Sequence, residues 1–302
     1  MPILSFTAKS ELLFAAEFLR ELWSLPSCGI RVRRRCIVRR MRPGILSRGP
    51  SLPLTPYAEC IWHHESGTPL EGRDQVLPDG RFHLMLNLEG GAGAVAGLRS
   101  HHVIVDTAQV SSLMGVVFRP GAARAFFAPP ALDFRDRAVK LDLVWDRASE
   151  AQLLDRLRAT NAAETRLRIV EATLIEGMLR FGRQHVPVHP VVHYALQAFG
   201  NVPDIRTVAD VSRELKWSRR WFTQVFAENV GMTPKRYCRL LRFQNVVRQI
   251  ASRESVNWAE LALACGFCDQ AHLVHEFRAF SGFSPELFLV SNRPYPNHVR
   301  IA

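Results

Sequence analysis

The sequence lacks an apolar run of the roughly 18–20 residues that a transmembrane helix needs. It also lacks a secretory signal, because the N-terminal basic cluster follows the apolar patch LLFAAEFL instead of preceding it. Six cysteines are scattered over 302 residues without disulfide-rich spacing, which favours reduced thiols. The motifs G-x-S-x-G, P-loop and H-E-x-x-H are absent, so no catalytic residue and no cofactor are predicted. We therefore expect a cytoplasmic protein that is not an enzyme.

Positive charge is abundant but uneven. A formal net charge of +11 and a pI near 10.0 favour a polyanionic partner, with nucleic acid ahead of an anionic membrane. Residues 1–50, however, hold ten basic and three acidic side chains, a net charge of +7, which leaves +4 for the remainder. We interpret residues 1–50 as a basic N-terminal extension that is disordered or mis-started, with Met41 as a candidate true start.

Residues 51–182 begin with strand signals and end with helical ones. In QVLPDGRFHLMLNLEGG a turn leads into an alternating segment that places Phe82, Leu84, Leu86 and Leu88 on one face. Further strands are predicted in HHVIVDTAQV and SSLMGVVFRPG, and several short strands of this kind indicate a small barrel or sandwich. Apolar spacing over 150–181 predicts helices that either pack on these strands or form a dimer interface. GRQHVPVHP then predicts a linker over 183–190.

An internal repeat dominates the last ninety or so residues. GMTP at Gly231–Pro234 matches GFSP at Gly282–Pro285 with an offset of 51, whereas DVSREL matches ELALAC with an offset of 50. The second copy therefore has one additional residue in its turn. Each copy reads as helix, short turn, helix and G-x-[ST]-P, with the second helix starting at a capping residue, Ser218 or Asp269. This order is typical of a helix-turn-helix, and an all-α bundle without a ligand is the alternative.

A single helix is predicted between the two copies, in PKRYCRLLRFQNVVRQIAS. At about 1.5 Å per residue, about seventeen helical residues span roughly 25 Å. Such a helix is suited to holding two recognition helices about one DNA turn, roughly 34 Å, apart. It carries a basic cluster, which is either a phosphate-contacting surface or a solvated basic face: Lys235, Arg236, Arg239 and Arg242.

The repeat closely resembles the DNA-binding domain of the AraC/XylS family of bacterial transcription regulators. The matching strings are SRRWFTQVFAENVGMTPKRYCRLLRFQNVVRQIA and WAELALACGFCDQAHLVHEFRAFSGFSPELF, within a domain that we place at residues 191–291. The resemblance implies that the second helix of each copy enters a major groove. Its implied base-contacting residues are Arg219, Arg220, Thr223, Gln224, Gln270, Ala271, Val274 and His275. Its implied phosphate-contacting residues are Ser218, Lys235, Arg236, Arg239 and Asp269.

Among these residues, Arg220 has the chemistry for a bidentate contact to guanine and Gln224 for one to adenine. Val274 and Glu276 depart from the polar or basic residues that are frequent in the family. The second copy is therefore expected to read little sequence directly.

The strings LTPYAECIW, VLPDGRFHLMLNL and MGVVFRPGAARAFFAPP look like the cupin-related sensor domains of one AraC-type subfamily. The implied fold class is α+β multidomain, with an N-terminal cupin-like β-barrel and helical segment, a C-terminal all-α tandem helix-turn-helix domain, and a tail at 292–302. Such sensor domains bind a small molecule, dimerise, or both. Arg81 and Arg119 are candidates for anchoring an acidic effector, with a structural salt bridge as the alternative.

We therefore expect a sequence-specific DNA-binding transcription regulator, such as an activator, in which the sensor domain controls the two recognition helices. Its expected partners are double-stranded DNA, RNA polymerase and an unidentified small-molecule effector, with a homodimer left open and no membrane. The alternative is a cupin-like metalloenzyme or small-molecule-binding protein with an accessory DNA-binding domain. Its metal ligands would come from the pairs His63–His64 and His101–His102. Because neighbours on a strand face opposite sides, we predict no metal site.

The string CGFC invites a zinc or redox interpretation, since His272 and His275 follow Cys265 and Cys268. In the repeat, however, Cys265 ends the first helix of the second copy. A redox C-x-x-C usually has its first cysteine at a helix N-terminus, where the thiolate is stabilised. We therefore predict that CGFC forms the turn of a DNA-reading unit.

Overall fold

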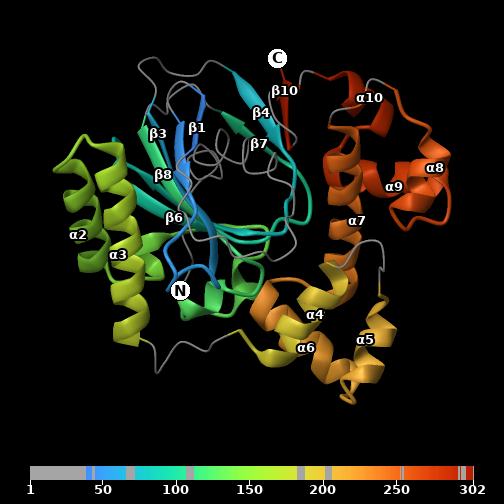
Figure 1. Ribbon diagram of the computed structural model, residues 1–302, viewed down its shortest axis with the longest axis horizontal. Helices are drawn as coiled ribbons and strands as arrows, with labels where there is room; N and C mark the ends of the chain where they lie inside the picture. Colours follow the sequence, from blue (N-terminus) through green and yellow to red (C-terminus); the bar gives the residue numbers. More distant parts are fainter. Residues whose placement is uncertain are drawn as a thin grey trace, which may run out of the picture.

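The computed structural model describes residues 39–42, 45–65, 72–106, 112–181, 188–200, 206–251, 253, 255–291, 293 and 297–301. Most of the predicted basic extension, including residues 1–38, lies outside this set. Strands and two helices form one half of the molecule, and a helical group forms the other half (Figure 1). The predicted α+β class is confirmed.

Two antiparallel sheets make up the strand-rich half. The larger sheet has the order β1-β2-β3-β8-β5-β6-β9 and the smaller one the order β10-β4-β7. The larger sheet consists of β1 (Arg39–Arg42), β2 (Ile45–Arg48), β3 (Ala58–Glu65), β5 (Phe82–Asn87), β6 (Ala92–Ala96), β8 (Ser112–Phe118) and β9 (Ala138–Lys140). The smaller sheet consists of β4 (Arg73–Val76), β7 (Val103–Asp106) and β10 (His298–Ile301). Over the described residues, the predicted barrel is therefore present as two sheets and not as one closed ring.

The core lies on one face of the larger sheet. Phe82, Leu84, Leu86 and Leu88 belong to one buried apolar cluster, as their alternation predicts, while His83 is buried on the opposite face. Helices α2 (Arg147–Arg158) and α3 (Ala163–Phe181) add to that cluster and cover the sheet beside β3 and β8 (Figure 1). Short 3-10 turns follow β8, namely η3 (Ala123–Ala125), η4 (Ala131–Phe134) and η5 (Leu141–Leu143).

Helices form the other half. They are α4 (Pro190–Gly200), α5 (Val208–Glu214), α6 (Arg219–Val230), α7 (Pro234–Ile250), α8 (Trp258–Ala264), α9 (Gln270–Ser281) and α10 (Pro285–Val290). Proline opens α7, whose 17 residues form one continuous helix as predicted. Its buried side includes Tyr237, Leu240, Val247 and Ile250. Among the described helices, none combines the length and hydrophobicity that a bilayer-spanning helix needs.

The segment that we expected to be a tail includes strand β10, which returns to the strand-rich half. It pairs with β4 in antiparallel register from His298 opposite Val76 to Ile301 opposite Arg73. The Arg300 Nε atom lies 2.6 Å from Oδ1 of Asp74, which is buried, and His298 Nδ1 lies 3.4 Å from Oδ2. A buried carboxylate needs such a partner. The last strand thus completes a charge pair of the N-terminal half.

Candidate nucleic-acid interface

The internal repeat folds as two helix-turn-helix units, which we call unit one (α5 and α6) and unit two (α8 and α9). The second helices begin at equivalent caps, where Ser218 accepts a hydrogen bond from Trp221 N at 3.3 Å and Asp269 accepts one from His272 N at 2.7 Å. They end at Gly231 and Gly282, whose φ angles of 96° and 77° are left-handed. Glycine adopts this left-handed conformation, which allows the last carbonyl groups of a helix to be hydrogen-bonded, without the steric strain that a side chain would add.

The turns of the two units also match. Lys216 has a φ of 55° and Gly266 has a φ of 77°, so the same left-handed position is occupied by lysine in unit one and by glycine in unit two. Residues other than glycine adopt this conformation at a cost of about 1–2 kcal/mol. Unit one therefore keeps the turn geometry in spite of its sequence.

The recognition helix of unit one, α6, separates a buried side from an exposed side. Phe222 and Phe226 are fully buried, whereas Arg219, Arg220 and Gln224 are exposed. In addition, Thr223 is half-buried, and its hydroxyl donates to Arg219 O at 2.8 Å. Gln224 donates to Glu228 at 3.0 Å. The predicted base-contacting residues of this unit thus share the outer side of one helix.

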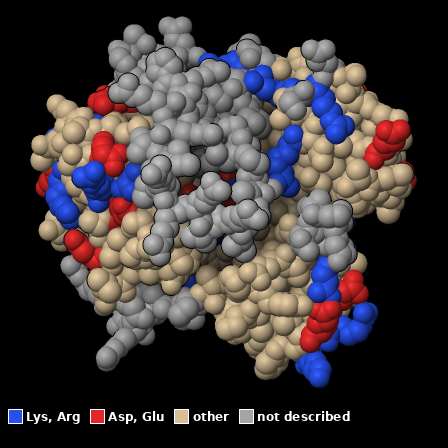
Figure 2. Space-filling view, in the orientation of Figure 1, with Lys and Arg blue, Asp and Glu red and all other residues tan. Residues whose placement is uncertain are grey.

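Charges around unit one are mixed, as blue and red side chains lie next to one another over α5 and α6 in Figure 2. Near α5, Arg206 pairs with Glu214, and Arg213 pairs with Asp210 at 3.1 Å. Within the part of the chain that the structure describes, no ion pair involves Arg219 or Arg220. Their guanidinium groups therefore remain available to an external anion.

The recognition helix of unit two, α9, has the same two sides with different chemistry. Leu273 and Phe277 are buried at the positions of Phe222 and Phe226. The outward positions hold Gln270, Ala271 and His275, which are exposed, and Val274, which is half-buried. This surface carries one amide and one imidazole but no arginine.

Helix α7 uses part of its basic cluster to hold unit two. Arg239 donates from Nε to Oε2 of Glu276 at 2.7 Å and from Nη2 to Oε1 at 2.9 Å, and Glu276 is buried. The guanidinium of Arg242 lies over the ring of Phe267, 5.6 Å from its centroid. Lys235 is exposed and Arg236 half-buried at the start of the helix. Of the predicted phosphate-contacting residues, Arg239 therefore already has an internal partner, a contact for which the sequence carries no signal.

The CGFC string lies in the turn of unit two, as predicted. Cys265 is fully buried, and its Sγ accepts a hydrogen bond from Asn245 at 3.5 Å. Burial raises the pKa of the Cys265 thiol to about 11. A thiol with that pKa is mostly protonated near neutral pH and is a poor nucleophile or metal ligand. Cys265 therefore serves packing at this position.

The family comparison agrees with this geometry. Residues 211–289, which contain unit two and all of unit one except the first three residues of α5, match the family model of a helix-turn-helix domain. These residues form an AraC-type helix-turn-helix domain. The other matching model covers residues 47–140 and is described as a domain of unknown function, DUF6597.

Structures of ToxT from Vibrio cholerae are similar to this chain at low identity. One crystal form is 7% identical over 82% of this chain and 98% of ToxT, with a TM-score of 0.36. A ToxT complex with (E)-4-(8-methylnaphthalen-1-yl)but-3-enoic acid is 8% identical over 76% of this chain and 96% of ToxT, with a TM-score of 0.39. No curated protein sequence gives a significant match. The assignment of residues 211–289 to the AraC type rests on the helix-turn-helix match.

Unit one of the AraC-type domain contacts the N-terminal half at the end of its recognition helix. Helix α6 packs against η4. A Cβ atom at Gly231, just after α6, would lie 3.1 Å from Ala131 O and 3.5 Å from the Phe82 ring. A side chain would be tight there, so glycine permits both the helix end and this close approach.

Unit two and α7 contact the N-terminal half through hydrogen bonds. His102 N donates to Phe280 O at 2.9 Å, near the end of α9, and the Gln75 side chain donates to Ser281 O. Gln244 of α7, which is buried, donates to Pro78 O and to Asn297 Oδ1. Both recognition helices are thus held at their C-terminal ends, which leaves their N-terminal ends outward.

The two arginines that we considered for an acidic effector have internal partners. Arg81 Nε donates to Glu59 Oε2 at 2.9 Å, and the other end of its guanidinium donates to Asp79 O at 3.3 Å. Arg119 is exposed, and its Nε donates to Thr55 O at 2.9 Å. Both arginines therefore make the internal contacts that are expected if their role is structural. An effector contact at either residue stays a prediction.

The histidine pairs lie in separate environments. His63 and His64 are both buried on β3, and His63 Nε2 lies 3.0 Å from Arg166 Nη1, which donates to it. Burial and the adjacent Arg166 charge lower the pKa of His63 to about 4. His101 is exposed beside Ser100, whereas His102 contacts the start of the loop after α9. His63 is therefore committed to a hydrogen bond in the core.

Proposed function

We propose that this AraC-type protein is a transcription regulator that reads DNA with α6 and α9 in successive major grooves. The observation that carries the proposal is the arrangement of two matched units on the single helix α7, with the N-terminal ends of both recognition helices exposed. Those ends are the parts of a recognition helix that contact base edges. The eight outward residues of α6 and α9 named above are the proposed reading surface.

Phosphate contacts are proposed at the edges of that surface. Lys235 and Arg236 supply cationic groups at the start of α7, while Ser218 and Asp269 mark helix N-termini, whose backbone N–H groups favour anions. Arg239 is retained as a candidate, although its pairing with Glu276 assigns it first to the support of unit two. Contacts of this kind position a protein on the duplex, and base contacts specify the sequence.

Selection of bound sequences from a pool of random DNA duplexes, followed by footprinting, tests the proposal. The expected footprint covers two major-groove segments about one helical turn apart on one face. Arg220→Ala should relax selectivity in one segment only. A footprint with a single segment would contradict reading by the two units. Equal sequence selectivity of the original protein and Arg220→Ala would contradict it as well.

Control of DNA reading is proposed to come from the N-terminal half, because that half contacts the ends of both recognition helices. A small-molecule effector that moves these contacts would change the presentation of units one and two, and RNA polymerase is the proposed partner at the promoter. A DNA-reading protein acts where the chromosome is, so we propose a cytoplasmic location. A reporter gene carrying the selected operator, with and without the effector, would measure both the sign and the extent of regulation.

A homodimer stays an open proposal. The apolar stripes of α2 and α3 that suggested it are occupied within the chain, since Leu153, Leu157 and Leu174 are buried in the core cluster. Sedimentation of the protein alone and on its operator would measure the oligomeric state.

We further propose that the protein catalyses no reaction. His63, the most buried candidate ligand, accepts a hydrogen bond from Arg166, and this contact competes with metal coordination. Near-stoichiometric metal in the purified protein would instead support the metalloenzyme alternative.

A further inference from the structure

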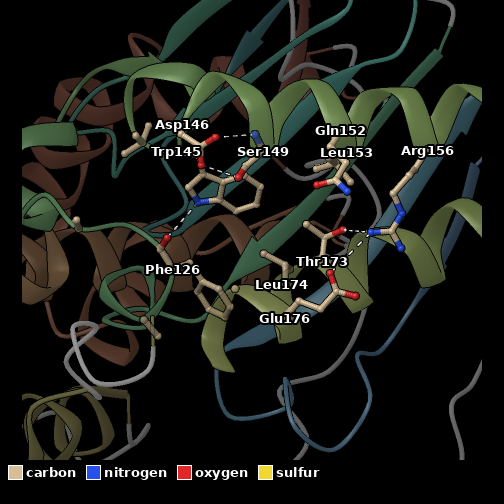
Figure 3. A pocket seen from close by; sticks show the side chains of 14 residues that line it. Phe126, Trp145, Asp146, Ser149, Gln152, Leu153, Arg156, Thr173, Leu174 and Glu176 are labelled. Carbon is tan, nitrogen blue, oxygen red and sulfur yellow. Dashed lines mark hydrogen bonds and ion pairs between the residues drawn. The ribbon is translucent and has the colours of Figure 1, made fainter. Parts of the chain in front are cut away.

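A pocket of about 300 Å³ lies between α2, α3 and the turn η3, outside the contacts of the helix-turn-helix units. This volume is at the lower end of the range of small-molecule sites. Figure 3 shows α2 and α3 crossing the pocket, with Phe126 and Trp145 toward one end and Arg156, Thr173 and Glu176 toward the other. Leu153 and Leu174 lie between these ends (Figure 3). The pocket therefore has an aromatic end and a polar end.

The aromatic end is held in place by its own contacts. Trp145 Nε1 donates to Phe126 O at 3.2 Å, and its ring stacks on Phe127 with centroids 6.3 Å apart. The Phe126 ring in turn packs on Phe118 and Tyr57. A fixed aromatic surface of this kind favours a flat aromatic partner.

The polar end pairs opposite charges. Arg156 Nη1 donates to Thr173 Oγ1 at 3.4 Å and lies 3.8 Å from Glu176 Oε2. A bound anion at this end would therefore meet the Glu176 carboxylate as well as the Arg156 guanidinium. Asp146 lies beside Trp145 at the aromatic end and accepts hydrogen bonds from Ser149 (Figure 3). A cationic group at this end would meet Arg156 directly. A neutral head group that both accepts from Arg156 and donates to Glu176, such as a primary amide, matches both partners.

One glycine lines the pocket from the interior of a helix. Gly177 lines the pocket within α3, and a Cβ atom built on it would have no atom within 4 Å. A glycine in a helix interior is less stable than alanine there. No close packing requires the glycine at this position, whereas an open cavity would explain it.

The wall of the pocket continues to unit one. Ala125 and Phe126 of the η3 region line the pocket, Phe127 packs on Phe134 of η4 with centroids 6.2 Å apart, and η4 contacts α6. Phe134 also packs on Phe82, whose ring lies at the end of α6. A continuous chain of packed rings thus connects the aromatic end of the pocket with unit one.

We infer that this pocket binds a small neutral aromatic molecule with an amide-like head group, and that its occupancy shifts the η3–η4 segment and, with it, α6. The ring lies against Phe126 and Trp145, and the head group lies between Arg156 and Glu176. The binding part stands by itself, and only the consequence for regulation rests on the proposed function.

Benzamide, benzoate and benzylamine test the ligand class, because they share a ring and differ in the charge of the head group. Titrations followed by ligand-observed NMR and calorimetry with the full-length protein would measure their affinities. We expect benzamide to bind about tenfold or more tightly than either charged analogue. Equal binding of benzoate, or no binding of benzamide up to millimolar concentration, would overturn the inference.

Gly177→Leu tests the location. The substitution places a side chain into the open space and improves helix propensity, so the variant is expected to fold. It should reduce benzamide affinity about tenfold or more, which corresponds to about 1.4 kcal/mol or more of binding free energy. The matched control is Gly200→Leu, because Gly200 ends α4, also has no atom within 4 Å of a built Cβ, and does not line the pocket. Unchanged affinity in Gly177→Leu, or an equal loss in both variants, would contradict this site.

Hydrogen exchange of the full-length protein, with and without saturating benzamide, tests the transmission and needs no DNA. We expect altered protection over 123–134 and 219–230, with 270–281 unchanged. Changes confined to α2 and α3 would show binding without transmission and overturn that part. Because the readout is independent of an operator, failure of DNA binding and failure of the pocket are distinguished.

Discussion

Unit one presents Arg219 and Arg220 at the exposed start of α6, whereas unit two presents Gln270 and Ala271 at the same positions of α9. Their backbones share caps, left-handed turns and terminal glycines. The difference therefore lies in the side chains that a common scaffold displays. We therefore expect unit one to read bases directly and unit two to position the protein on the duplex.

The turns of the two units also differ in the burial and the contacts of their aromatic residue. Phe267 of unit two is buried beneath Arg242, while Trp217 of unit one is 52% exposed and stacks on Trp221 with centroids 4.3 Å apart. Unit two is thus bound to α7 by two arginines, and unit one is bound to the N-terminal half through η4. An effector that moves η4 should therefore act on unit one first.

The largest expected effect comes from separating unit two from α7. Arg239→Ala should lower the free energy of unfolding by about 2–3 kcal/mol, because it leaves the buried Glu276 carboxylate without its partner. Denaturant unfolding measures this change. Lys235→Ala, an exposed cation on the same helix, is the control and should stay within about 0.5 kcal/mol of the original protein. Equal effects would show that the Arg239–Glu276 pair does not hold unit two.

Base reading should then distinguish the two units. Arg220→Ala should weaken operator binding by about 1–3 kcal/mol at the contacted base pair, as expected for loss of a bidentate contact. His275→Ala, at the outward face of unit two, should weaken it by less than about 1 kcal/mol. Binding to the selected operator and to single-base variants measures both. A larger loss in unit two would reverse the assignment of roles.

The turns provide a matched pair of substitutions. Lys216→Gly should raise the free energy of unfolding by roughly 0.5–1 kcal/mol, since glycine removes left-handed strain but adds unfolded-state entropy. Gly266→Ala should lower it by about 1–2 kcal/mol for the same reason. Thermal and denaturant unfolding of both variants measures the changes. If Lys216→Gly does not raise the free energy of unfolding and Gly266→Ala does not lower it, the backbone at Lys216 is not strained.

The smallest expected effect concerns phosphate contact at the start of α7. Lys235→Ala should weaken binding to all duplexes nearly equally and reduce the dependence of log K on log salt by about 1. Affinities at several salt concentrations measure the slope. An unchanged slope would remove Lys235 from the phosphate-contacting set.

Much of the helical half follows from local sequence. The repeat predicts the caps at Ser218 and Asp269, and Pro234 predicts the start of α7, because caps and turns depend on neighbouring residues. Alternation likewise predicts the buried face of β5. The Arg239–Glu276 pair carries no such signal, since it joins two helices whose relative position only the tertiary fold sets. The pocket depends on the packing of α2, α3 and η3, and the pairing of β10 with β4 depends on a strand far away in the sequence.

Strand β10 follows the helical half in sequence but belongs in space to the strand-rich half. The chain leaves the strand-rich half once, builds both units, and then returns to pair with β4, so the DNA-binding helices form an insertion tied at both ends. A fragment cut after α10 would remove the partners of Asp74 and expose the edge of β4. Mechanical load applied at Ile301 would likewise reach the β10–β4 ladder before it reached any helix. The last few residues therefore belong, in physical terms, to the first domain.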